Sequence, residues 1–192
     1  MYIREVSDIH LEFGDFHLPE MPEDKDTVLV LAGDIGLARR IEQLGAFLLD
    51  CSVRFKAVIY ILGNHEHYHY ALDETAIAIH QRMAYLGLNN VFLMENETKV
   101  IDNVAFICAT LWTDYDNDKA KLVLANHAMN DHRLIVKSRN NLVLFTPAAA
   151  QELHFASRQF VFEAVKTWRT AGFKRSSAAG RGGRCPPTAP GA

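Results

Sequence analysis

This chain of 192 residues has few cysteines, no excess of basic residues and no long apolar segment. Its three cysteines, Cys51, Cys108 and Cys185, include no CxxC pair, which favours a reducing, cytoplasmic location. The net charge of -3 gives no broad positive field, so nucleic acid is expected as a partner only if it is a substrate. The longest apolar run, 104–112, is far shorter than the roughly 20 residues that span a bilayer, so no membrane segment is expected.

Neither a GxGxxG nor a GxxxxGK[ST] loop is present, which leaves little support for a dinucleotide- or P-loop nucleotide-binding module. The remaining composition, 49% apolar and 22% charged, is typical of one soluble globular domain. We predict that this domain spans residues 1–170. Residues 171–192 contain five Gly, five Ala, three Pro and no acidic residue, and they cannot bury enough apolar surface to offset their ordering entropy. We therefore predict that 171–192 is a disordered tail.

The order of apolar patterns predicts an α/β fold. Residues 2–7, 27–32 and 56–62 are β-like runs, and the last two lack polar alternation, which is typical of strands buried on both faces. Apolar residues at helical spacing follow in 41–48 and in 72–86, where Gly87 ends the pattern. This βαβαβ order predicts a mainly parallel sheet.

The second half of the domain is predicted to be more antiparallel. Short β-like runs occupy 91–94, 98–101 and 104–109, with Asp102-Asn103 as a tight turn between the last two. Residues 114–146 mix charged and scattered apolar residues and are predicted to form a cap over the site. Pro147 is predicted to open a helix that runs to about residue 169.

Three polar motifs stand where the predicted strands end. Asp8 and His10 are two residues apart, so their side chains can point the same way, although a solvated loop pair has the same pattern. Gly33-Asp34 allows a sharp turn followed by a carboxylate that can reach two cations, although Asp34 could instead cap the next helix. Gly63-Asn64-His65-Glu66 is the most specific motif, because an amide beside a histidine directly after a buried strand has few structural explanations.

The motifs DxH, GD and GNHE, in this order and spacing, resemble those of the calcineurin-like metallophosphoesterase superfamily over residues 1–170. The resemblance implies a partial two-sheet α-β-β-α sandwich of the metallophosphoesterase type and a dinuclear metal centre that hydrolyses phosphate esters. In this family Asp8 and His10 would bind the first metal, Asp34 would bridge the two, and Asn64 would bind the second. His65 would be the catalytic histidine that protonates or stabilises the leaving oxygen.

The two divalent ions are expected to be manganese, with iron or zinc as alternatives, because carboxylate, imidazole and amide ligands occur without thiolate. His67 and His69 continue an alternating pattern but are predicted to lie on an exposed loop. His127, His132 and His154 are predicted to be surface or core residues rather than ligands.

The sequence departs from the family in one respect. The family completes its metal shell with a Gly-His-x-His motif, and no Gly-His dipeptide occurs here. We therefore expect a weak second metal site, an incomplete domain that lacks its C-terminal strands through truncation or a frameshift, and weakened or lost turnover. The alternative is a non-catalytic remnant that binds metal or phosphate. Uncovered sheet surface would also favour self-association.

Overall fold

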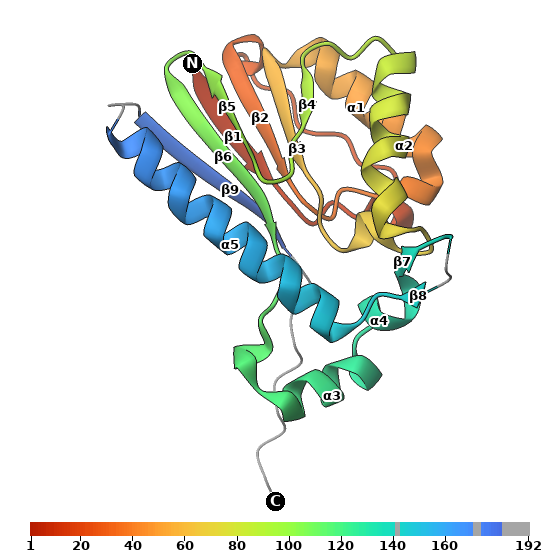
Figure 1. Ribbon diagram of the computed structural model, residues 1–192. Coiled ribbons are helices and arrows are strands. Elements are labelled where there is room, and N and C mark those ends of the chain that lie inside the picture. Colours follow the sequence, from red (N-terminus) through yellow and green to blue (C-terminus); the bar gives the residue numbers. More distant parts are fainter. Residues whose placement is uncertain (141–142, 171–173, 182–192) are drawn as a thin grey trace, which may run out of the picture.

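The computed structural model describes residues 1–140, 143–170 and, as backbone only, 174–181 (Figure 1). Its main sheet is parallel and follows chain order: β1 (Tyr2–Val6), β2 (Thr27–Ala32), β3 (Ala57–Ile61) and β4 (Val91–Leu93). Helices α1 (Ile41–Arg54) and α2 (Leu72–Tyr85) connect these strands and cover one face of the sheet. The predicted α/β fold class is confirmed.

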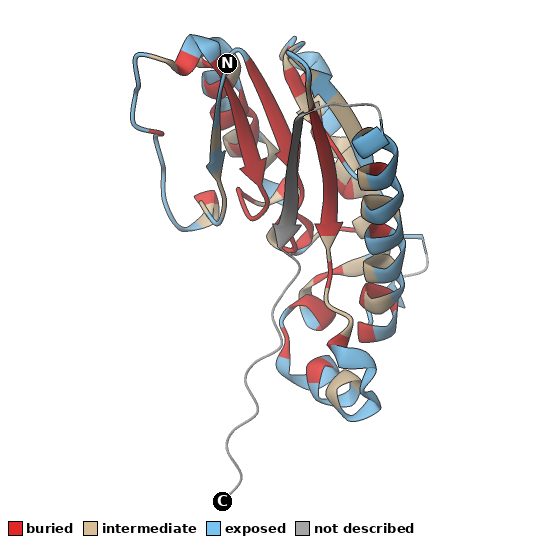
Figure 2. Cartoon of the chain, turned by 90° about the vertical axis from the view of Figure 1, so that its left-hand side faces the viewer, coloured by how far each residue is buried: buried red, intermediate tan, exposed pale blue. Residues whose placement is uncertain are grey.

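A second sheet packs against the other face of the main sheet. It contains β5 (Glu97–Ile101), β6 (Val104–Leu111) and β9 (Lys174–Arg181), with β5 antiparallel and β9 parallel to β6. The long helix α5 (Pro147–Thr170) runs along the outer side of this second sheet (Figure 2). The layers are therefore helix, sheet, sheet and helix, as expected for an α-β-β-α sandwich.

A small cap lies beyond the carboxyl ends of the parallel strands (Figure 1). It contains α3 (Lys119–Ala128), α4 (Asp131–Leu134) and the antiparallel pair β7 (Val136–Ser138) and β8 (Val143–Leu144). The cap has its own apolar core, in which the Trp112 and Phe145 rings meet edge to face with centroids 4.7 Å apart. Single 3-10 turns occur at η1 (Leu11–Phe13), η2 (Asp24–Asp26), η3 (Ala38–Arg40), η4 (His65–His67) and η5 (Tyr115–Asn117).

The central strands β2 and β3 of the main sheet are buried on both faces because they divide their side chains between two cores. In β2, Leu29 and Leu31 pack toward α1 and α2, whereas Val28 and Val30 pack toward the second sheet. All six residues of β2 are buried, as the absence of polar alternation predicted. This double burial fixes the strand ends that carry the polar motifs.

Two turns of the chain follow the predicted backbone chemistry. Asp102 and Asn103 both have positive φ, 47° and 63°, between the antiparallel β5 and β6, as a tight hairpin turn requires. Gly87, which ends α2, has φ of +67°, a conformation that glycine adopts without strain.

The position of β4 corrects the prediction that residues 91–94 belong to the antiparallel half of the domain. β4 pairs parallel with β3, with Val58 opposite Val91 and Tyr60 opposite Leu93, and forms an edge of the main sheet. The reason is that α2 is long enough to return the chain to the start of the sheet, so the next strand joins the parallel order.

The predicted disorder of 171–192 also differs from the structure in part. Lys174–Arg181 forms β9, paired parallel with β6 from Val104 to Leu111. Composition predicts whether side chains can bury apolar area, but pairing at the free edge of a strand needs only backbone donors and acceptors. The remainder of the predicted tail lies outside the described residues.

Within the described ranges, no helix is both long and apolar enough to cross a membrane. Cys51 and Cys108 are buried free thiols, and burial raises the pKa of each to about 12. Cys185 lies outside the described residues.

Candidate metal centre

The carboxyl ends of β1, β2 and β3 meet at one edge of the main sheet, where backbone hydrogen bonds join the loops that follow them. The amide of Asp8 donates to the carbonyl of Gly33 (3.1 Å), and the amide of His10 donates to the carbonyl of Asp34 (3.0 Å). One ligand atom each from Asp8, His10 and Asp34 lies within 4.8 Å of the other two. The structure thus brings together three of the residues that the sequence predicts as metal ligands.

Each of these three residues has a left-handed backbone, with φ of 56° at Asp8, 53° at His10 and 56° at Asp34. Aspartate and histidine adopt this region more readily than most residues, yet it costs on the order of 1 kcal/mol at each position. The surrounding hydrogen bonds hold the backbone there. Strain of this kind concentrates at functional sites, because it aims side chains in directions that regular strands do not offer.

The third motif is attached to the same cluster through Asp34. The backbone N–H of His65 donates to Oδ1 of Asp34 (3.0 Å). Gly63 lies so close that a Cβ added there would stand 2.6 Å from the backbone nitrogen of Asp34. The glycine is therefore required by close approach rather than by a special φ. Asn64, between these two residues, is held at the same edge of the sheet.

The Asn64 amide is oriented by the cap. Its Nδ2 donates to Oδ1 of Asp131 (2.8 Å) and to the hydroxyl of Tyr68 (3.1 Å), and that hydroxyl also donates to Asp131 (2.6 Å). Both donors of the amide are thus used. This orientation leaves the carbonyl oxygen as the group that Asn64 can offer to a cation.

Glu66 joins the loops that follow β2 and β3 from inside the protein. Its carboxylate, fully buried, accepts hydrogen bonds from the backbone N–H groups of Asp34, Ile35 and Gly63 and from the hydroxyl of Tyr60, at 2.7 to 3.1 Å. Burial raises the pKa of Glu66 to about 7, and the charge of Asp34 adds to this, whereas the hydrogen bonds oppose it. Because both oxygens are engaged, Glu66 supports the site and is not itself a ligand.

The electrostatics of Asp34 fit a bound cation. Burial raises the pKa of Asp34 to about 6, and the negative charges of Asp8 and Asp131 act in the same direction, against the hydrogen bond from His65 and the influence of His10. Asp34 is buried and Asp8 is exposed, and the repulsion between two carboxylates this close is relieved when a positive charge lies between them. The donor set of two carboxylates and one imidazole suits a divalent ion.

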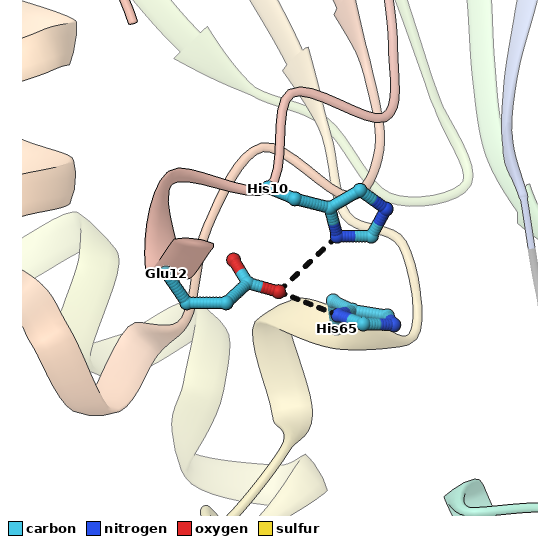
Figure 3. Close-up of side chains that lie close together, drawn as sticks. All are labelled: His10, Glu12 and His65. Atoms are coloured by element: carbon cyan, nitrogen blue, oxygen red, sulfur yellow. Dashed lines mark hydrogen bonds and ion pairs between the residues drawn. The ribbon is translucent and has the colours of Figure 1, made fainter. Parts of the chain in front are cut away.

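A second cluster adjoins the first and includes His65 (Figure 3). Oε1 of Glu12 lies 2.7 Å from Nδ1 of His65 and 3.1 Å from Nδ1 of His10. The two imidazole rings are 4.3 Å apart, and the ring of Tyr68 stacks on His65 at the same distance. Since the Nδ1 atoms of both histidines face Glu12, their Nε2 atoms are the ones that remain for a metal or a substrate.

Glu12 is the residue that the sequence reasoning missed. Its side chain is only 7% exposed, and its Oε2 is buried without a hydrogen-bond partner in the structure. Burial would raise the pKa of Glu12, but the hydrogen bonds with His65 and His10 more than offset burial, so this pKa is lowered. The sequence signal was present, because Glu12 extends the Asp8-x-His10 alternation by two more residues. His10, Glu12 and His65 also lie within 4.8 Å of one another.

The second predicted metal site is less complete than the first. Two groups of three acidic or imidazole ligands occur among the described residues, and neither combines Asp34 with a ligand from the second sheet. Asp131 is the nearby carboxylate in the cap, but its Oδ1 is engaged by Asn64 and Tyr68. Asp34 and Asn64 remain as the candidate pair.

The remaining histidines are structural or peripheral. His67 is buried, which corrects the predicted exposed loop; its Nδ1 lies 2.8 Å from Oγ1 of Thr75, and burial lowers its pKa to about 3. In η4 the His67 ring is buried near Trp112, with ring centroids 6.0 Å apart, instead of facing solvent. His69 is exposed as predicted, and His132 is a core residue bonded to Tyr115 (2.9 Å).

Comparison with known proteins supports the fold and gives little about activity. No family model matches the sequence. The chain is 30% identical over 154 residues to "Uncharacterized protein L509" of Acanthamoeba polyphaga mimivirus, a match that covers 72% of the chain and 53% of that protein. The chain therefore spans about half the length of this curated relative.

Among solved structures, the chain is similar to phosphopantetheinyl hydrolase (PptH) from Mycobacterium tuberculosis, with a TM-score of 0.52 and 17% sequence identity. The similarity covers 94% of this chain and 67% of the other. At this level of identity the likeness concerns the fold. The α/β sandwich around the candidate metal centre is thus one that a known hydrolase also adopts.

Proposed function

We propose that this chain is a metallophosphoesterase, a hydrolase that cleaves phosphate esters with the help of divalent metal ions bound at the edge of the main sheet. The observation that carries the proposal is the convergence of Asp8, His10 and Asp34 beside a histidine, His65, whose Nδ1 is held by Glu12. The motif resemblance and the fold shared with a hydrolase support the same conclusion.

The described residues offer more ligands to the first proposed metal ion than to the second. Asp8, His10 and Asp34 would hold the first ion, and Asp34 with the carbonyl oxygen of Asn64 would hold a weaker second one. Manganese is the expected metal, with iron or zinc as alternatives. Bound divalent ions would acidify water and stabilise charge on the phosphate oxygens.

His65 would supply the proton that the leaving oxygen needs. With Nδ1 directed at Glu12, the proton that His65 can deliver is the one on Nε2. Tyr68 stacks on the ring and limits its rotation. A cavity of about 590 Å³ opens beside His65 and gives the organic part of an ester room to bind.

Hydrolysis of p-nitrophenyl phosphate and bis(p-nitrophenyl) phosphate, measured together with metal content per chain, tests the proposal. We expect manganese-dependent turnover by the wild type. Asp34→Asn should lose both metal and turnover. His65→Ala should keep its metal but lose turnover about 100-fold or more, since general acid catalysis contributes about that much. The matched control is His80→Ala, an exposed histidine on α2.

The second candidate function is metal or phosphate binding without catalysis. The incomplete second site, with Asp34 and Asn64 alone, is the observation that favours it. Metal bound stoichiometrically by the wild type, with equal and negligible turnover in wild type and His65→Ala, would establish this alternative in place of the hydrolase.

A further inference from the structure

The cavity beside His65 has walls of two chemical kinds. Phe13 and Leu37 contribute apolar surface, and Arg39 and Arg40 contribute guanidinium groups. All four come from η1, from η3 and from the turn before η3, and Glu12 lines the same cavity. Because His65 also lines the cavity, a group bound here would be on the side of the leaving oxygen.

Phe13 offers a flat aromatic surface to this cavity. Its side chain is 81% exposed, although it stands on the cavity wall and its ring centroid is 5.7 Å from that of His10. One face of an aromatic ring that stays open beside the candidate metal ligand His10 can stack on a flat ligand ring, and base–aromatic stacking is strong for any nucleobase.

The two arginines offer a site for a second anion. Nη1 of Arg40 donates to the backbone carbonyl of Glu12 (3.0 Å). Because Glu12 immediately precedes Phe13 in the sequence, this bond holds the Arg40 guanidinium close to the Phe13 backbone. The described part of the structure gives neither arginine a carboxylate partner, so their charges are not neutralised by the protein. Guanidinium groups bind phosphate with two parallel hydrogen bonds, and they would add to the attraction of the metal centre.

We propose that this cavity binds a nucleoside monophosphate group, with the base stacked on Phe13 and the phosphate held by Arg39 and Arg40. The proposal rests on the proposed function and narrows its substrate class to phosphate esters of a nucleotide. Hydrolysis would break the bond between the scissile phosphorus and a nucleotide oxygen. Water would supply the new oxygen on phosphorus, and His65 would supply the proton to the departing nucleotide.

Calorimetric titration with AMP, adenosine and ribose 5-phosphate, in the presence of a chelator, tests the subsite without the metals. With no metal available, a phosphate can be held only by the protein itself, and the result does not depend on turnover. We expect the wild type to bind AMP at least about tenfold more tightly than either fragment, because stacking and phosphate contacts each contribute. Added salt should weaken AMP binding and leave adenosine binding nearly unchanged.

Variants assign each half of the ligand to its residue. Phe13→Ala should remove the advantage of AMP over ribose 5-phosphate, and Arg39→Gln should remove its advantage over adenosine. Arg39 is the better choice of the two arginines, because Arg40 also bonds the backbone. Matched controls are Phe16→Ala, in the same loop but lining a different cavity, and Arg158→Gln, exposed on α5.

The proposal is overturned if AMP does not bind to the metal-free wild type, or if it binds no better than ribose 5-phosphate. Equal losses in Phe13→Ala and Phe16→Ala would also overturn it, since the effect would not be specific to the cavity. If AMP binds as expected but no phosphate ester is hydrolysed with manganese present, the subsite stands and the proposed catalysis fails, so the two outcomes are distinguishable.

Discussion

Two carboxylates that bind no predicted metal hold the site in shape. Glu66 accepts hydrogen bonds from backbone N–H groups in the two loops that follow β2 and β3. Glu12 bonds both His65 and His10. Each lies two positions after a predicted metal ligand, Glu66 within the Gly63–Glu66 motif and Glu12 just beyond the Asp8-x-His10 motif. Burying a carboxylate is costly, and the hydrogen bonds that it accepts offset this cost, so each of these two carboxylates fixes the groups that donate to it.

Glu12→Gln tests the function of Glu12 as a positioning residue for His65. An amide can accept fewer hydrogen bonds and carries no charge, so the imidazole rings should lose their fixed orientation. We expect kcat to fall by about 10- to 100-fold, as for other residues that orient ligands and catalytic groups, with KM changed little.

The loss of kcat in Glu12→Gln should be greater for phenyl phosphate than for p-nitrophenyl phosphate, because the poorer leaving group needs the proton more. Equal losses for both esters would instead indicate a general structural defect. Glu20→Gln, exposed in the same loop, is the control.

Asp34 and Glu66 should make the metal-free protein less stable as the pH rises. Burial raises their pKa values to about 6 and about 7, whereas unfolded carboxyls titrate near 4. Between about pH 4 and pH 7 the folded protein therefore holds more protons than the unfolded chain, so the free energy of unfolding decreases with rising pH. We expect the melting temperature in chelator to fall by about 5 °C over this window, and to fall less in Asp34→Asn. A melting temperature that rises over the same window would contradict this assignment.

At the scale of elements, local patterns predicted most of the chain correctly. The residues of β2 were predicted with their observed bounds, and α1, α2 and α5 occupy the segments where apolar residues repeat at helical spacing. The errors were of pairing. Residues 91–93 read as a short strand in either sheet, because the side-chain pattern of a three-residue strand does not encode its partner. The strand at 174–181 was missed because backbone pairing leaves no apolar pattern.

Gly63→Ala tests the contact between the end of β3 and the loop after β2. A Cβ at residue 63 would press against the backbone of Asp34, which Glu66 also holds, so neither side can move without breaking hydrogen bonds. We expect the free energy of unfolding to decrease by about 1–3 kcal/mol, as in other overpacked sites, together with weaker metal binding. Gly14→Ala is the control, because a Cβ there meets nothing within 4 Å. Denaturant unfolding of both variants gives the comparison, and similar stabilities would rule out the proposed crowding.

For the molecule as a whole, the two-sheet sandwich explains why the candidate metal ligands gather at one edge of the main sheet. Three parallel strands, of which β2 and β3 are buried on both faces, present their carboxyl ends together, and the cap closes over them through the bond from Asn64 to Asp131. The same architecture leaves β1 at an edge, where Tyr2 and Ile3 are 57% and 44% exposed. Edge strands with exposed apolar side chains are sites of intermolecular pairing.

We therefore expect the purified chain to self-associate. Its weight-average sedimentation coefficient should increase with concentration, and Ile3→Lys should reduce that increase, because a charged side chain on an edge strand opposes pairing with a second copy. Val53→Lys, at a more exposed apolar position on α1, is the control. A single monomeric species at all concentrations would count against the prediction.

Local sequence patterns specified the order of the elements from β1 to β6, the burial of β2 and β3, and the presence of ligand-type side chains at three strand ends. These features are local, since periodicity and motif spacing are written along the chain. The folded chain is needed to see that Asp8, His10 and Asp34 share one site, that Glu12 joins His10 to His65, and that Asp131 orients Asn64. Those contacts join residues up to 67 positions apart, and their geometry depends on strand register and loop backbone, which no local pattern specifies.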